Sequence, residues 1–173
     1  MKRFLPIFTL LLLGCQKPAP EETPKPDAAQ RVDATRPGTD WPRFLGPNAD
    51  GSSPETGILK DWPKTGLKKL WDCKLGQGYA PPVVAKGRLF HFDRYGDNIR
   101  LTCRNAASGE LIWKYEYPTE YEDMYGYEPG PRAGAVADGE KIYAIGPEGM
   151  LLAVNGEGKE LWKLDTRKAY RFH

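Results

Sequence analysis

Short apolar runs alternate with turn-forming residues through the second half of the chain. Gly, Asn, Ser and Asp separate these runs, which in the C-terminal part cover about residues 133–138, 140–145, 149–154 and 159–164. Runs of this length rich in Val, Ile, Leu, Tyr and Phe predict β-strands. Lys86-Gly87 and Asp138-Gly139 suit hairpin turns, because Gly adopts a positive φ without steric cost. No stretch has sustained helical periodicity, so the pattern predicts an all-β fold.

The strand pattern occurs twice. The segment from Gly87 to Trp113 recurs from Gly139 to Trp162, with corresponding residues 49 to 52 positions apart. A half-copy, Leu67-Lys-Lys-Leu-Trp71, ends in the same way 42 residues before Trp113. A unit of four antiparallel strands that repeats every 40 to 50 residues is typical of a β-propeller blade.

The ends of the two copies resemble the pyrroloquinoline-quinone (PQQ)-type repeat, with Asn105 and Asn155 where that repeat usually has Asp. The opening Asp40-Trp-Pro-Arg-Phe-Leu-Gly-Pro-Asn48 and the later Gly130-Pro-Arg-Ala133 are similar to PQQ-like propeller proteins of planctomycete-type bacteria. More loosely, the chain resembles the outer-membrane assembly propeller lipoprotein and the propellers of quinoprotein dehydrogenases.

The resemblance implies an incomplete β-propeller of four-stranded antiparallel blades over residues 41–173. It gives about two full blades and a partial one, in which Lys68–Leu75 would be an outer strand. It also implies that Trp71, Trp113 and Trp162 dock each blade on the next, which agrees with the large area an indole buries at the end of a strand. Closed propellers contain four to eight blades. We therefore expect a truncated or partial propeller, or one whose free edges need partner chains.

The N-terminus has the layout of a bacterial export signal. Lys2 and Arg3 precede ten mostly apolar residues, too few to span a bilayer. The sequence Leu12-Leu13-Gly14-Cys15 resembles a lipobox, so residues 1–14 are predicted to be a lipoprotein signal peptide and Cys15 the site of lipidation. Residues 15–40 are rich in Pro and charge and predict a disordered tether. The expected location is the cell envelope, lipid-anchored on the periplasmic face, with the outer membrane favoured.

The charge balance argues against nucleic acid as a partner. Without Lys2 and Arg3, the remaining 23 basic residues equal the 23 acidic residues. A neutral chain without a basic run has no electrostatic footprint for a polyanion. The 40% hydrophobic and 28% charged residues also exclude a polytopic membrane protein and a coiled coil.

A tyrosine-rich segment, residues 115–128, links the two copies and offers a candidate ligand loop. Tyr121, Tyr125 and Tyr127, interleaved with carboxylates, could form an aromatic platform for a sugar or a peptide. The alternative, which we favour, is that the rings cover blade edges while the carboxylates are solvated. Possible partners are therefore envelope proteins or polysaccharide, besides the membrane itself.

Catalytic residues are not expected. Quinoprotein dehydrogenases hold their cofactor with adjacent Cys residues and calcium, and no two Cys are adjacent here. Asp93, Asp97 and Asn98 fit a turn between strands better than a calcium site, and His91, in an alternating strand, fits a structural role. Neither PQQ nor calcium is expected. Cys73 and Cys103 can pair or remain buried thiols, and both alternatives stay open.

The sequence therefore predicts a membrane-anchored, non-catalytic PQQ-like propeller module that acts as a binding scaffold in the cell envelope. Two alternatives remain. One is a fragment of a PQQ-dependent dehydrogenase, and the other is a carbohydrate-binding envelope protein. Repeat architecture by itself does not choose among them.

Overall fold

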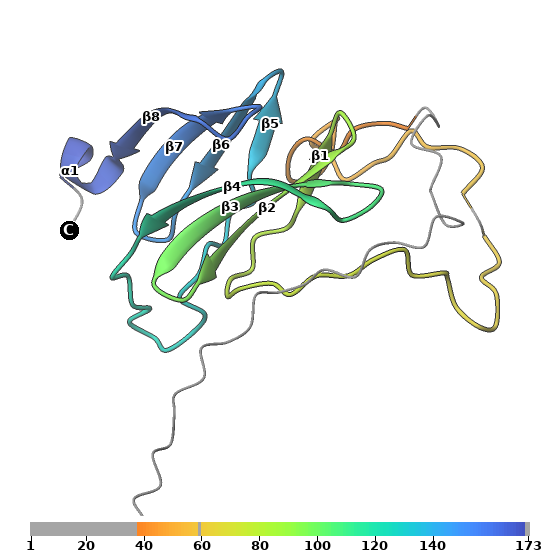
Figure 1. Ribbon diagram of the computed structural model, residues 1–173, viewed down its shortest axis with the longest axis horizontal. Coiled ribbons are helices and arrows are strands. Elements are labelled where there is room, and N and C mark those ends of the chain that lie inside the picture. Colours follow the sequence, from red (N-terminus) through yellow and green to blue (C-terminus); the bar gives the residue numbers. More distant parts are fainter. Residues whose placement is uncertain (1–37, 59, 172–173) are drawn as a thin grey trace, which may run out of the picture.

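Two four-stranded antiparallel sheets form the folded part of the chain (Figure 1). The computed structural model describes residues 38–58 and 60–171. Sheet 1 consists of β1 (Val83–Ala85), β2 (Arg88–Tyr95), β3 (Asn98–Asn105) and β4 (Leu111–Pro118). Sheet 2 consists of β5 (Val136–Asp138), β6 (Lys141–Ile145), β7 (Met150–Asn155) and β8 (Glu160–Asp165). Each sheet follows chain order, which confirms the predicted all-β fold with four strands in each repeat.

Tight turns fix the register of each hairpin. Lys86 and Gly87 both have positive φ, 51° and 69°, as a two-residue turn of type I′ requires. Gly96 and Asp97 form the next turn, so Asp93 lies opposite Arg100 in the β2–β3 ladder. The strands of sheet 2 begin within three residues of their predicted positions.

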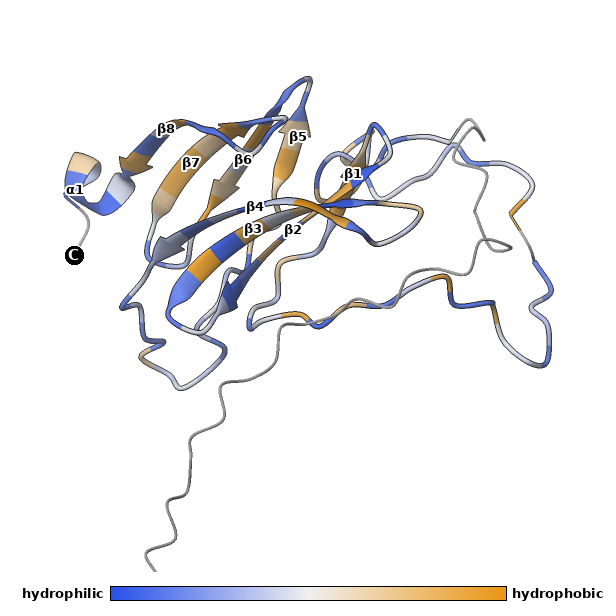
Figure 2. Cartoon of the chain, viewed as in Figure 1, coloured by the Kyte–Doolittle hydropathy of each residue, from blue (hydrophilic) through white to orange (hydrophobic). Residues whose placement is uncertain are grey.

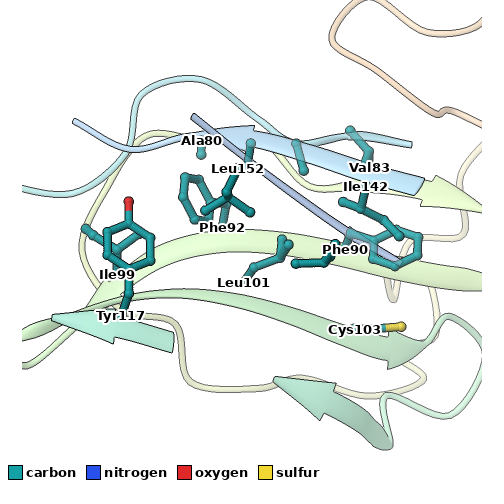
Figure 3. Packing of buried hydrophobic residues seen from close by; sticks show 13 residues of the cluster. Ala80, Val83, Phe90, Phe92, Ile99, Leu101, Cys103, Tyr117, Ile142 and Leu152 are labelled. Atoms are coloured by element: carbon teal, nitrogen blue, oxygen red, sulfur yellow. The ribbon is translucent and has the colours of Figure 1, made fainter. Parts of the chain in front are cut away.

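The core lies between the two sheets. Alternation along the strands directs Phe90, Phe92 and Leu101 of sheet 1 toward sheet 2. Ile142 and Leu152 of sheet 2 point back toward Phe90 and Phe92 (Figure 3). Each sheet therefore has one face in this core and one face turned away from it. The alternation is visible as blue and orange bands along β3 (Figure 2).

The two sheets correspond residue by residue. Phe90, Cys103 and Trp113 lie side by side across sheet 1, as Tyr143, Ala153 and Trp162 do across sheet 2. The ring pairs match as well, with Phe90–Trp113 centroids 5.9 Å apart and Tyr143–Trp162 centroids 6.1 Å apart. Both ladders shift register at the same place, after Cys103 and after Ala153. The sequence repeat is thus a repeat of structure, including its irregularity.

Two local features differ from the sequence prediction. Residues 68–75 do not form the expected strand, because no described strand lies alongside them to exchange hydrogen bonds. A short helix, α1 (Thr166–Tyr170), follows β8 and was not predicted. The Asp165 side chain caps it by accepting a hydrogen bond from the Lys168 N–H. In the described residues, no helix has the length and apolar character needed to cross a bilayer.

The opening motif joins the two sheets at their first strands. Trp41 and Val84 exchange backbone hydrogen bonds of 2.8 and 2.9 Å, and the next carbonyl, that of Pro42, accepts from the Ala137 N–H. The motif thereby extends the edge of β1 and contacts β5. Gly46 packs on the Trp41 indole, where a Cβ would lie 2.7 Å from the ring.

Candidate functional site

The indoles of Trp71 and Trp113 make the same contact, one repeat apart. Trp71 Nε1 donates to the carbonyl of Ala106 at 3.0 Å, and Trp113 Nε1 donates to the carbonyl of Gly156 at 2.8 Å. Both carbonyls directly follow the repeated Asn in the turn between the third and fourth strands of a sheet. Each indole therefore reaches from one repeat unit onto the turn of the next.

The turns are shaped to receive these rings. Asn105 Oδ1 accepts from the N–H groups of Ala107 and Ser108, and Asn155 Oδ1 accepts from those of Glu157 and Lys159. An Asn side chain that satisfies backbone donors in this way stabilises a tight turn. A Cβ added to Gly109 would lie 2.5 Å from Trp71 Cδ2, and one added to Gly158 would lie 2.6 Å from Trp113 Cδ2. We call this contact of indole, carbonyl and glycine the indole interlock.

Trp162 occupies the corresponding position in sheet 2 without a partner turn among the described residues. Trp162 is 43% exposed, and its ring packs against that of Tyr143. Ile145 and Leu164 lie on the same face and are each 38% exposed. By register, this face corresponds to the face of sheet 1 that sheet 2 covers.

The tyrosines of the candidate ligand loop have different surroundings. Tyr121 is half-buried, and its carbonyl accepts from Arg94 Nη1. Tyr125 and Tyr127 are exposed, with ring centroids 6.4 Å apart. Asp123 holds the loop by pairing with Arg132 at 2.7 Å and by accepting from the Tyr125 N–H. Tyr125 and Tyr127 are therefore accessible, whereas Tyr121 belongs to the base of the loop.

The two described cysteines are free thiols on opposite faces of sheet 1. Cys103 points into the core between the sheets, and burial raises the pKa of its thiol to about 11. Cys73 lies beside the other face, where it lines a cavity. Cys15, the predicted lipidation site, lies outside the described residues.

The face of sheet 1 turned away from sheet 2 is polar yet buried. We call it the polar face, and it carries His91, Asp93, Arg100, Thr102 and Arg104, each at most 9% exposed. At its centre, Arg100 Nε and Nη2 donate to the two oxygens of Asp93 at 2.9 and 2.6 Å. Burial alone would lower the pKa of Arg100, but the hydrogen bonds and the charge of Asp93 raise it above its usual value.

Asp93 thus belongs to an ion pair. Asp97 and Asn98, the other two residues considered as calcium ligands, lie in or next to the β2–β3 turn. Asp97 is an exposed turn residue and Asn98 begins β3. Arg100, Thr102 and Arg104 of this face were not predicted from the sequence. The alternation of polar residues along β3 and the two-residue turn, which sets Arg100 opposite Asp93, are the signals that could have revealed them.

Among the described side chains of the polar face, His91 has a ring nitrogen without a hydrogen-bond partner. Its Nδ1 is buried without a hydrogen-bond partner, and it lies 3.7 Å from Asp93 Oδ2, beyond hydrogen-bonding distance. Burial lowers the pKa of His91, and the charge of Asp93 opposes this only in part. The imidazole is consequently neutral near pH 7.

Residues 71–77, here called the cover segment, run across the polar face (Figure 1). At one end the Trp71 interlock fixes the segment. At the other end the Gly76 N–H donates to Asp93 Oδ2, and Gln77 exchanges two backbone bonds of 2.8 Å with Arg94. A cavity of about 240 Å³ remains between the segment and the sheet.

The chain matches no family model and no curated protein sequence.

Proposed function

We propose that residues 41–173 supply two blades and a partial one of a PQQ-like β-propeller, which acts without catalysis as a binding scaffold of the bacterial cell envelope. Lipid attached to Cys15 would anchor it to the membrane, on the periplasmic face, with the outer membrane favoured. The observation that carries the proposal is the indole interlock, formed twice by an indole N–H, the carbonyl that follows the repeated Asn, and the Gly that ends the turn.

The stacking of the two sheets supports the propeller assignment. A propeller places four-stranded sheets around an axis, each packed on the next through equivalent faces. The register correspondence of the sheets and the equal spacing of their ring pairs agree with such packing. On this proposal, the open face around Trp162 receives a further sheet, and its indole finds another turn that begins with Asn and has Gly three or four residues later.

Photocrosslinking tests this arrangement. In the full chain, p-benzoylphenylalanine at position 162 in place of Trp162 is expected to crosslink, after irradiation of producing cells, to a peptide containing such a turn. Mass spectrometry of the crosslinked peptide gives the sequence. The same probe in place of Met124, an exposed apolar residue of the tyrosine loop, serves as the control. Identical products from both positions would contradict the assignment.

Lipid labelling tests the anchor. Cells that produce the full chain and are fed an alkyne-tagged fatty acid should yield a labelled, membrane-bound protein. Cys15→Ser should abolish the label and release the chain from the membrane fraction, since a single thiol carries the predicted attachment. Cys73→Ser should leave both unchanged. Label retained in Cys15→Ser would refute lipidation at this residue.

A further inference from the structure

Sheet 2 packs on sheet 1 through one of its faces. The equivalent face of sheet 1 is the polar face, and the two differ in chemistry. The register that aligns Trp113 with Trp162 also aligns three residues of the polar face, His91, Thr102 and Arg104, with Ala144, Leu152 and Val154. In sheet 2 these positions are apolar and enter the core, whereas in sheet 1 they are polar. Burying such groups against an apolar surface costs free energy unless each finds a polar partner. The polar face is therefore unsuited to the apolar packing that sheet 2 makes on sheet 1, and its groups need polar partners.

The cavity over the polar face combines an apolar wall with buried donors. Trp71, Leu75, Pro82 and Leu89 form the apolar wall, and Arg104, Thr102 and His91 form the floor. Its volume of about 240 Å³ exceeds the roughly 150 Å³ that accommodates benzene in an engineered apolar cavity. It therefore has room for one small organic molecule.

The charges around the cavity do not cancel. Arg100 is neutralised by Asp93. Arg104 donates from Nη1 to the Gly109 carbonyl at 3.0 Å and has no carboxylate partner among the described residues. Lys74 adds a second positive charge at the rim. A guanidinium carries five N–H donors, so Arg104 can donate to a ligand while it keeps its bond to Gly109.

We propose that this cavity binds a small organic carboxylate whose apolar body lies against Trp71 and Leu89. The carboxylate accepts charge-assisted hydrogen bonds from the guanidinium of Arg104, and Lys74 adds a second positive charge at the rim. Apolar contact with the indole and the leucine orients the rest of the ligand. The site uses sheet 1, Pro82 directly before it and the cover segment, so it does not depend on the propeller assignment.

Calorimetric titration of the full chain with benzoate tests the proposal. Benzoate is expected to bind saturably, with one site per chain. Benzamide has the same size without the charge, and it should bind at least about tenfold more weakly, because it loses the charge-assisted hydrogen bonds. Inorganic phosphate has the charge without the apolar body and should also bind more weakly than benzoate.

Two kinds of variant locate the site. Arg104→Gln should weaken benzoate binding at least about tenfold, whereas Arg132→Gln, outside the cavity, should not. Leu75 lines the cavity from the cover segment and is 54% exposed, so its substitution leaves the core intact. Leu75→Asp should weaken benzoate binding several-fold more than Leu75→Asn, which has the same shape without the charge. Circular dichroism checks that each variant is folded.

Three results would overturn the proposal: no saturable benzoate binding by the folded wild type, benzamide or phosphate binding as tightly as benzoate, or equal affinities of Leu75→Asp and Leu75→Asn. If Arg104→Gln does not fold, the Leu75 pair decides alone.

Discussion

Asp93→Ala is expected to lower the free energy of unfolding by about 3–5 kcal/mol, the usual cost of removing one partner of a buried ion pair. Asp93 is 1% exposed and accepts hydrogen bonds from Arg100 and from the Gly76 N–H. Its removal takes away the two hydrogen bonds and the nearest counter-charge of the buried Arg100 guanidinium, leaving only the weaker attraction of Glu116, and it also releases the cover segment. The Tyr95 ring, 4.2 Å from Arg100 Cζ, offsets only part of this cost.

Urea unfolding followed by tryptophan fluorescence measures the loss. The matched control is Glu140→Ala, which removes the acidic partner of Lys86 in an exposed ion pair. That variant should unfold at nearly the wild-type urea concentration, because solvent screens exposed pairs. A loss below about 1 kcal/mol for Asp93→Ala would mean that water reaches Arg100 and that the polar face is not sealed.

Gly158→Ala is expected to cost about 2–5 kcal/mol, the second largest effect, by disrupting the indole interlock. Gly158 has a φ of 78°, which costs an Ala about 1–2 kcal/mol. In addition, the new Cβ would lie 2.6 Å from the Trp113 ring, so the indole must move off its turn. Overpacking of this kind adds about 1–3 kcal/mol.

Gly139→Ala separates the two contributions. Gly139 has a similar φ of 62°, but a Cβ there meets nothing within 4 Å. Denaturant unfolding of both variants should show the larger loss for Gly158→Ala, with a shift in tryptophan emission that Gly139→Ala lacks. Equal losses would mean that the Trp113 contact contributes nothing beyond backbone strain.

The elements of this fold are predictable from sequence to the extent that their causes are local. Alternation and turn glycines determine where β5 to β8 begin and end, so their positions could be expected within a few residues. The repeated Trp was also recognisable, but the carbonyl it contacts, that of Ala106 or Gly156, depends on how the sheets stack. The strand expected over residues 68–75 is not formed, and the reason is non-local: a β-strand needs an adjacent strand with which to exchange hydrogen bonds.

The candidate cavity could be predicted only in part. His91 and Asp93 alternate with Phe90 and Phe92, so one face of β2 could be recognised as polar. That this face is buried depends on the cover segment, which lies about twenty residues earlier in the chain and has no regular pattern. These polar residues form a candidate site only because they are buried, and sequence periodicity alone does not predict that burial.

The junction at Trp41 has a mechanical consequence. In the part of the chain that the structure describes, the first backbone bonds to a sheet are the two that Trp41 exchanges with Val84. Tension applied through the preceding residues therefore loads the outer edge of β1 before any other strand. The Pro42 carbonyl, held by Ala137, shares that load with β5. A pull from this end is thus divided between both sheets and does not peel one sheet from the other.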